Sequence, residues 1–316
     1  MKIATFPKFG GDGRTASLLD EEIILLGNDA FGTKGKYITI QKPRDGLLAM
    51  KYTNDDFHLR HFPHSHTSLV SKNTLAVVGG KFKSKGMLSK FTWTELSLFW
   101  NNGSGKFNPN IIHSCNIKLG SDVHMIFGGA MKNNDPRGSR QVLKVNTTDE
   151  TIVELKPMTL ERVFHTCQLL THDIVLVSGG LPMLPYEGGP LSAIQQDELY
   201  SVTSQGTVRN LSSGSSLGRY QHASSRLGSQ IYAFGGKDSN NDATSKIAFF
   251  DVSTYTWKNL LDQELVSSNT SELVVSPYPI SSLDCVPVCQ CGITNGNEKI
   301  FGGTVAKVLQ EMIPVY

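Results

Sequence analysis

Short apolar runs that end in glycine recur along the whole chain. They read IILLG, AVVGG, MIFGG, VLVSGG, YAFGG and KIFGG, and their first glycines are Gly27, Gly79, Gly128, Gly179, Gly235 and Gly302. Successive first glycines are 52, 49, 51, 56 and 67 residues apart. An apolar β-run does not continue easily through two residues that lack side chains, so the chain is expected to turn sharply there. The pattern predicts a repeat of about fifty residues, each containing one buried strand.

Other elements recur in phase with these glycines. A polar turn and a strand of small residues come about a dozen residues earlier, at His66-Thr67-Ser68, His113-Ser114-Cys115, His165-Thr166-Cys167 and His222-Ala223-Ser224. A third β-rich run follows the glycines at 47–52, 95–100, 141–145, 198–202 and 246–252, and a fourth follows at 57–62, 152–157, 207–211 and 254–260. With four strands in each unit and no amphipathic helix, the fold is expected to be all-β.

A four-stranded unit of this length with a glycine doublet resembles the kelch repeat, in which each repeat is one blade of a β-propeller. The resemblance covers 1–316 as a single domain, although Asn28 replaces the second glycine of the first unit. The run at 2–7 matches the fourth-strand pattern, and only one strand fits after Gly303. We therefore expect a six-bladed propeller that the N-terminal strand closes, with 262–284 as an inserted surface loop.

Composition narrows the class of protein without naming a partner. Hydrophobic residues make up 39% of the chain, and 30 Lys and Arg against 28 Asp and Glu give a net charge of +2. No apolar run reaches the ~18 residues of a membrane-spanning helix, and the first residues lack the apolar segment of a secretory signal. The five cysteines are an odd number, which fits a reducing compartment. These features predict a cytoplasmic protein with no membrane partner, in which cysteines such as Cys115 and Cys167 are small buried strand residues.

The propeller topology predicts which face binds a partner. In a four-stranded meander, the connection into the innermost strand and the loop after the second strand lie on the same face. The candidate residues on this face are Arg14, Arg162, His165, Arg219, His222, His66 and His113. Arg14, Arg162 and Arg219 either bind a phosphate or carboxylate at the channel mouth, or brace neighbouring blades through backbone carbonyls.

The loops on this face are unevenly charged. Those of the first three units are basic, through Lys81, Lys83, Lys85, Lys132, Arg137 and Arg140 among others. Those of the next two units carry acidic residues, namely Glu187, Asp197, Asp238 and Asp242. The basic half of the rim either attracts an anionic partner, such as RNA or an acidic peptide, or serves only to keep the protein soluble.

No catalytic residue, cofactor or metal is expected on this chain. Four histidines lie close together at His58, His61, His64 and His66, but no carboxylate or cysteine with ligand spacing lies beside them. The loop 27–34 lacks the Gly-Lys-Ser/Thr order of a phosphate-binding loop, and no G-x-S-x-G motif is present. An enzyme whose site is assembled from several blades stays open as a third hypothesis.

Within the kelch proteins, three segments resemble the C-terminal propeller of the tRNA wybutosine-synthesising carboxymethyltransferases. They are KFGGDGR at 8–14, ERVFHTCQLLTHDIVLVSGG at 161–180 and GRYQHASSRLGSQIYAFGG at 218–236. In that family the propeller follows an S-adenosylmethionine-dependent methyltransferase domain, which this chain does not contain. The resemblance implies a non-catalytic docking module whose partner is tRNA or a methyltransferase domain. The alternative is a stand-alone kelch adaptor that holds a peptide or protein.

Overall fold

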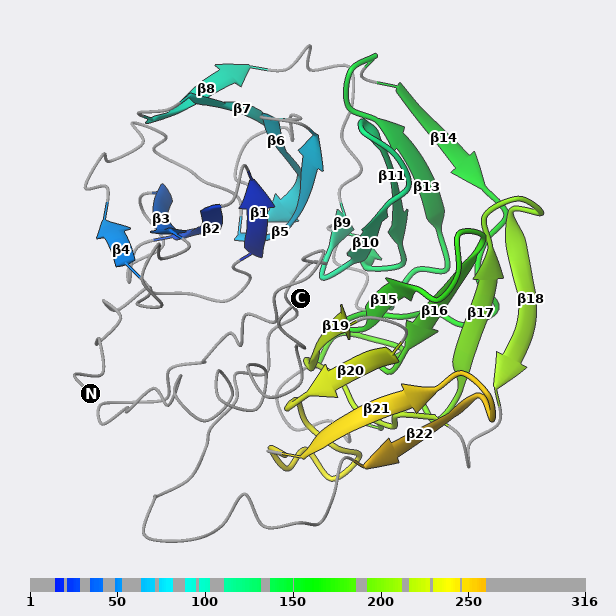
Figure 1. Ribbon diagram of the computed structural model, residues 1–316. Helices are drawn as coiled ribbons and strands as arrows, with labels where there is room; N and C mark the ends of the chain where they lie inside the picture. The colour runs from blue at the N-terminus through cyan, green and yellow to red at the C-terminus, as the bar shows by residue number, and fades with distance from the viewer. Residues whose placement is uncertain are drawn as a thin grey trace, which may run out of the picture.

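The protein is built from four-stranded antiparallel sheets that follow one another along the chain (Figure 1). The computed structural model describes the strands of the first 102 residues and then residues 111–131, 137–149, 151–185, 192–211, 216–227, 230–244 and 246–259. In the first two sheets the strands are β1 (Thr15–Leu19), β2 (Glu22–Asn28), β3 (Gly35–Gln41), β4 (Ala49–Tyr52), β5 (His64–Ser71), β6 (Thr74–Lys81), β7 (Ser89–Thr94) and β8 (Ser97–Asn102).

The next three sheets repeat the same order of strands. Their strands are β10 (Cys115–Lys118), β11 (Val123–Phe127), β13 (Val142–Asn146), β14 (Thr151–Leu155), β15 (Thr166–Leu169), β16 (Ile174–Ser178), β17 (Asp197–Ser201), β18 (Gly206–Leu211), β19 (Ala223–Leu227), β20 (Gln230–Phe234), β21 (Ile247–Asp251) and β22 (Thr256–Asn259). A two-stranded ribbon of β9 (Ile111–Ile112) and β12 (Ala130–Met131) extends the third sheet beyond its glycine doublet.

Consecutive sheets meet through their first strands. β1 contacts β5, β5 contacts β10, β10 contacts β15, and β15 contacts β19. In Figure 1 these strands lie innermost and the fourth strands, such as β14 and β18, lie outermost. This is the arrangement of propeller blades, so the prediction of an all-β kelch propeller is confirmed for the described part of the chain. The sixth blade, the closing strand at 2–7 and the insertion at 262–284 lie outside the described residues and stay predictions.

The assignment of strands within the first two sheets was wrong. The apolar runs at 47–52 and 95–100, expected as third strands, overlap the fourth strands β4 and β8 instead. The third strands β3 and β7 begin after shorter loops than their counterparts in later sheets, so the spacing from the glycines misled the prediction. The run at 57–62, expected as a fourth strand, lies outside the described residues.

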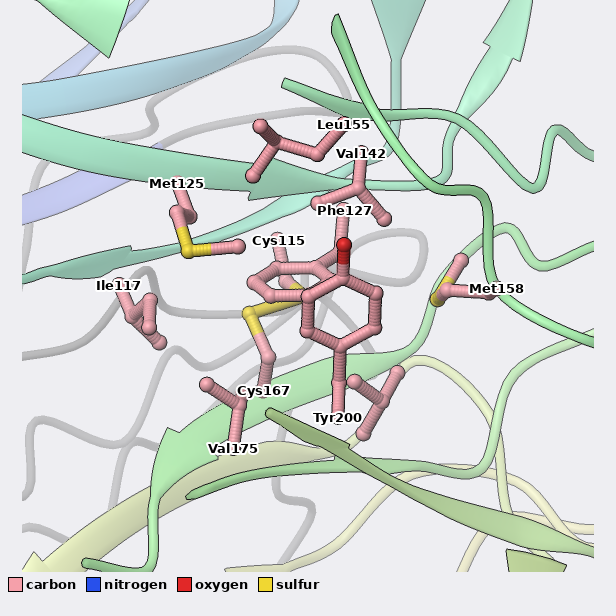
Figure 2. Packing of buried hydrophobic residues seen from close by; sticks show 11 residues of the cluster. Cys115, Ile117, Met125, Phe127, Val142, Leu155, Met158, Cys167, Val175 and Tyr200 are labelled. Carbon is pink, nitrogen blue, oxygen red and sulfur yellow. A yellow bond between two sulfur atoms is a disulfide. The ribbon is translucent and has the colours of Figure 1, made fainter. Parts of the chain in front are cut away.

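The buried core lies between neighbouring sheets. The second strands β11 and β16 are buried along nearly their whole length, whereas the outer strand β14 is exposed apart from the partly buried Ile152 and the buried Leu155 at its end. Figure 2 shows the layer between the third and fourth sheets, where Met125 and Phe127 face Val175 and Tyr200. The rings of Phe127 and Tyr200 meet edge to face with their centroids 5.3 Å apart. Removing these side chains from water is the main contribution to holding consecutive sheets together.

The glycine doublets hold each sheet against the next one. Gly128 and Gly129 have φ angles of 57° and 93°, which side chains other than glycine rarely adopt. A Cβ atom on Gly128 would lie 2.8 Å from the carbonyl oxygen of Arg162, which belongs to the following sheet. The Gly129 N–H donates to that same oxygen at 2.8 Å. The doublet is therefore required by close packing between sheets as well as by the turn.

Candidate interaction face

The turn before each innermost strand fixes the positions of the candidate histidines. Cys115, Thr166 and Ala223 each pair with the residue that precedes the first glycine of their own sheet. The preceding residues Ser114, His165 and His222 are therefore equivalent. The grouping of His113 with these histidines was wrong by one residue, because His113 lies 15 residues before Gly128, whereas His165 lies 14 before Gly179 and His222 lies 13 before Gly235.

His113 is instead equivalent to Phe164 and Gln221. All three have positive φ angles, of 57°, 56° and 55°. The Phe164 N–H donates to the carbonyl oxygen of His113 at 3.2 Å, and the Gln221 N–H donates to that of Phe164 at 2.9 Å. The rings of His113 and Phe164 lie with their centroids 4.0 Å apart. These three residues form a hydrogen-bonded inner rim, at which His113 and Gln221 are partly exposed.

Arg162 is buried within the fourth sheet. Its side chain has no exposed surface and forms an ion pair with Glu198, with Nη2 and Oε1 3.2 Å apart. It also donates to the carbonyl oxygens of Gly179 at 2.7 Å and Gln196 at 2.5 Å. The sequence left open whether Arg162 binds a phosphate or carboxylate of a partner or braces the blades through backbone carbonyls. Its contacts are of the second kind.

Arg219 makes the equivalent contacts one sheet later. Its Nη1 donates to the carbonyl oxygens of Lys246 at 2.7 Å and Gly235 at 3.5 Å, and its exposed fraction is 7%. Burial lowers the pKa of Arg219, against the effect of Asp238. Both described arginines therefore secure a glycine doublet and the start of a third strand. Arg14 and the side chain of His66 lie outside the described residues.

His165 and His222 pack between consecutive sheets. His165 Nε2 donates to the carbonyl oxygen of Phe127 in the preceding sheet at 3.1 Å, and His222 Nε2 lies 2.7 Å from the Thr166 hydroxyl. Both rings are fully buried. Burial first, and the nearby Arg162 or Arg219 second, lowers the pKa of each ring to about 3.

These lowered pKa values predict a loss of stability in acid. In the unfolded chain each imidazole takes up a proton below its ordinary pKa of 6.5, whereas in the folded chain it stays neutral down to about 3. The stabilising effect is therefore complete above pH 6.5 and is lost as the pH falls toward 3, at up to about 1.4 kcal/mol per pH unit for each ring. Urea unfolding at pH 7 and pH 5 measures this slope.

Replacing His165 by glutamine should make that slope shallower, because the amide can still donate to Phe127 and carries no titrating group. The exposed His172 provides the matched control, and His172→Gln should leave the slope unchanged. Equal slopes for His165→Gln and the unmodified chain would contradict the assignment of a neutral buried imidazole.

The outer part of this face is formed by loops that bond to one another. Arg137 bridges to Met183 of the following sheet, and the Gly138 N–H donates to the carbonyl oxygen of Pro182 at 2.7 Å. Arg137, Arg140 and Met183 are exposed. This segment, residues 137–140 with 181–183, is a connected outer rim. It retains two cations of the predicted basic half.

The remaining charges of the rim are placed only in part. Lys81 ends β6, but its side chain and the residues Lys83, Lys85, Lys132 and Glu187 lie outside the described part of the chain. Asp197, counted as a rim acid from sequence, is fully buried in β17, which corrects that expectation. Its carboxylate accepts hydrogen bonds from the Gly179 N–H at 3.0 Å and the Trp257 ring N–H at 2.7 Å. Asp238 and Asp242 lie in the loop after the fifth doublet, as expected.

Two features of the site were missed from sequence. Glu198 is the acidic partner of Arg162, and it also accepts the N–H groups of Thr159 at 2.7 Å and Leu160 at 3.0 Å. The Asp-Glu pair at 197–198, which begins the buried strand β17, was the available signal. Cys115 and Cys167 form a disulfide, which the reading of both as simple small residues did not foresee. Disulfides are rare in reducing compartments, so this bond does not agree with the expectation of a reducing compartment that was drawn from the number of cysteines.

Within the described residues, no three His, Cys, Asp or Glu side chains are grouped so as to hold a metal ion. The same part of the chain has no helix with the length and apolar character needed to cross a membrane.

The repeated sheets, their contacts through innermost strands and their glycine doublets are those of a kelch-type β-propeller. A Kelch motif model matches residues 218–260, which are the fifth described sheet together with its preceding turn. The chain is also similar to tip elongation aberrant protein 1 of Schizosaccharomyces pombe, with 28% identity over 179 residues. The match covers 55% of this chain and 15% of that relative, so the chain spans only a small part of the relative's length.

Proposed function

We propose that this chain is a protein-interaction module that binds its partner on the face formed by the inner rim and the outer rim. The observation that carries the proposal is the Kelch motif match at 218–260, because kelch repeats as a class mediate binding between proteins. The match includes Gln221 of the inner rim. No catalytic role is assigned to the chain.

The geometry of the face supports this proposal. The inner rim is fixed by backbone hydrogen bonds between sheets, and the outer rim by the contacts of Gly138 and Arg137 with the loop 181–183. Loops held in this way lose little conformational freedom when a partner binds, which lowers the cost of association. The outer rim also carries exposed cationic and apolar side chains, such as those of Arg140 and Met183.

The tRNA-docking hypothesis has less support. It rests on the resemblance of 8–14, 161–180 and 218–236 to the wybutosine enzymes, and neither the Kelch match nor the relative from Schizosaccharomyces pombe extends that resemblance to tRNA. The two described arginines proposed to contact phosphate, Arg162 and Arg219, are buried against carbonyl oxygens. A protein or peptide partner is therefore the function that we propose.

Selection of peptides from a random displayed library on the purified chain tests this proposal. Gln221→Gly removes a rim side chain while tolerating its positive φ, and Arg140→Ala removes a cation while keeping the carbonyl that Met158 uses. Each variant should weaken binding of the selected peptides by about tenfold or more. His172→Ala, on the turn at the opposite edge of the fourth sheet, is the control and should bind normally.

Two results would overturn the proposal. Equal loss of binding in the His172 and rim variants would place the binding surface elsewhere. Binding of an anticodon stem-loop that weakens steeply with salt, together with failure to select any peptide, would favour the tRNA hypothesis instead.

A further inference from the structure

The disulfide joins the innermost strands of two consecutive sheets. Cys115 begins β10 of the third sheet and Cys167 lies in β15 of the fourth, 52 residues further along the chain, with their Cα atoms 5.8 Å apart. Their exposed fractions are 6% and 3%. In Figure 2 the two sulfur atoms lie among the side chains of Ile117, Phe127 and Val175. The bond is thus inside the core layer that holds these two sheets together.

Neighbouring pairs of sheets use a different contact at the same place. Thr67, at the start of the second sheet, bonds to the Ser114 hydroxyl of the third sheet at 2.6 Å. Thr166, in the fourth sheet, lies 2.7 Å from His222 Nε2 of the fifth sheet. Thr67 and Thr166 each pair with the residue before their glycine doublet, as Cys115 does. Cys115 therefore stands where the second and fourth sheets have a threonine hydroxyl.

The junction between β10 and β15 consequently lacks that hydroxyl contact. His165 occupies the position of His222, but its Nε2 donates to the carbonyl oxygen of Phe127. The described backbone contacts across this junction include those from the Phe164 N–H to His113 and from the Gly129 N–H to Arg162. The disulfide takes the place of the side-chain hydrogen bond, so the oxidation state of the two cysteines decides how firmly this one junction is closed.

We propose that the Cys115–Cys167 pair is a redox-controlled lock between the third and fourth sheets, beside the inner rim. The oxidant is a low-molecular-weight disulfide of the glutathione class. One cysteine thiolate attacks it to form a mixed disulfide and releases one thiol. The second cysteine thiolate then displaces the second thiol, so two cysteines lose two electrons and two protons while one external disulfide becomes two thiols. Because both sulfurs are buried, exchange requires the junction to open first.

Hydrogen exchange of the full chain in glutathione disulfide and in dithiothreitol tests the lock. After reduction, the amides of Phe164 and Gly129 should exchange about tenfold faster or more, because local opening of this junction becomes easier. The amides of Gln221 and Gly180 make the equivalent contacts across the next junction, to Phe164 and Arg219, and serve as internal controls. Their exchange rates should change less than twofold. Thiol alkylation followed by peptide mapping should show the 115–167 crosslink only in the oxidised sample.

Cys115→Thr introduces the residue that the second and fourth sheets have at this position and should abolish the redox dependence of the Phe164 amide. The comparison of the unmodified chain in its oxidised and reduced states still tests the proposal if this variant fails to fold. The proposal is overturned if both cysteines stay reduced at equilibrium with glutathione disulfide. It is also overturned if reduction leaves the Phe164 and Gly129 amides unchanged, or accelerates all four amides equally.

Discussion

Replacing Arg162 by methionine is expected to lower the free energy of unfolding by about 3–5 kcal/mol, because Glu198 would remain as a buried carboxylate without its cation. Both side chains have no exposed surface, and the guanidinium also satisfies the carbonyl oxygens of Gly179 and Gln196. The change therefore removes one charge and several donors from a place that water does not reach. Urea unfolding followed by circular dichroism at pH 7 measures the difference.

Arg140→Met is the matched control for Arg162→Met, since Arg140 is exposed, and it should change the free energy by less than about 0.5 kcal/mol. Adding Glu198→Gln to Arg162→Met should recover part of the loss, because the amide is neutral and its oxygen still accepts from Leu160. A loss no larger than that of Arg140→Met would mean that Arg162 is not a brace.

Replacing Gly179 by alanine is expected to destabilise the fold by about 2–4 kcal/mol. The residue has a φ of 64°, and an added Cβ would lie 2.1 Å from the carbonyl oxygen of Arg219 and 2.8 Å from the His222 ring. The backbone oxygen cannot move away without breaking the hydrogen bond that it accepts from Gly180 at 2.7 Å. Thermal or urea unfolding measures the effect.

Gly120→Ala is the control for Gly179→Ala, because a Cβ at Gly120 would meet nothing within 4 Å. That variant should change the free energy of unfolding by less than about 0.5 kcal/mol. If the two alanine variants were equally stable, the close approach between the fourth and fifth sheets would be refuted.

The repeated glycines predicted the fold well because they encode a local requirement. The turn at Gly128 and Gly129 needs positive φ angles, and the sequence repeats this doublet in every unit except the first, where Asn28 replaces the second glycine. The third and fourth strands of the third to fifth sheets were predicted because each of them falls on one of the β-rich runs that follow the glycines. In the first two sheets the loops before β3 and β7 are shorter, and apolar runs alone did not separate a third strand from a fourth.

The site was harder to predict because its contacts join distant residues. Whether Arg162 reaches a ligand or a carbonyl depends on Glu198, which the sheet brings to it from 36 residues away. Cys115 and Cys167, which form the disulfide, are one repeat apart and occupy different register positions. The repeat pattern therefore did not indicate that they pair. His113 was misplaced because it is the nearest histidine to the expected position, whereas the strand register makes Ser114 the equivalent of His165.

The bonds from each glycine doublet to the following sheet determine how the chain can be divided. The Gly129 and Gly180 amides both find their acceptors in the next unit, on Arg162 and Arg219. A fragment that stopped after β14 or β18 would leave one such donor unsatisfied and the adjoining apolar layer open to solvent. Single repeats are therefore not autonomous building blocks, and truncations or chimeras of this protein should keep each doublet together with the turn of its successor.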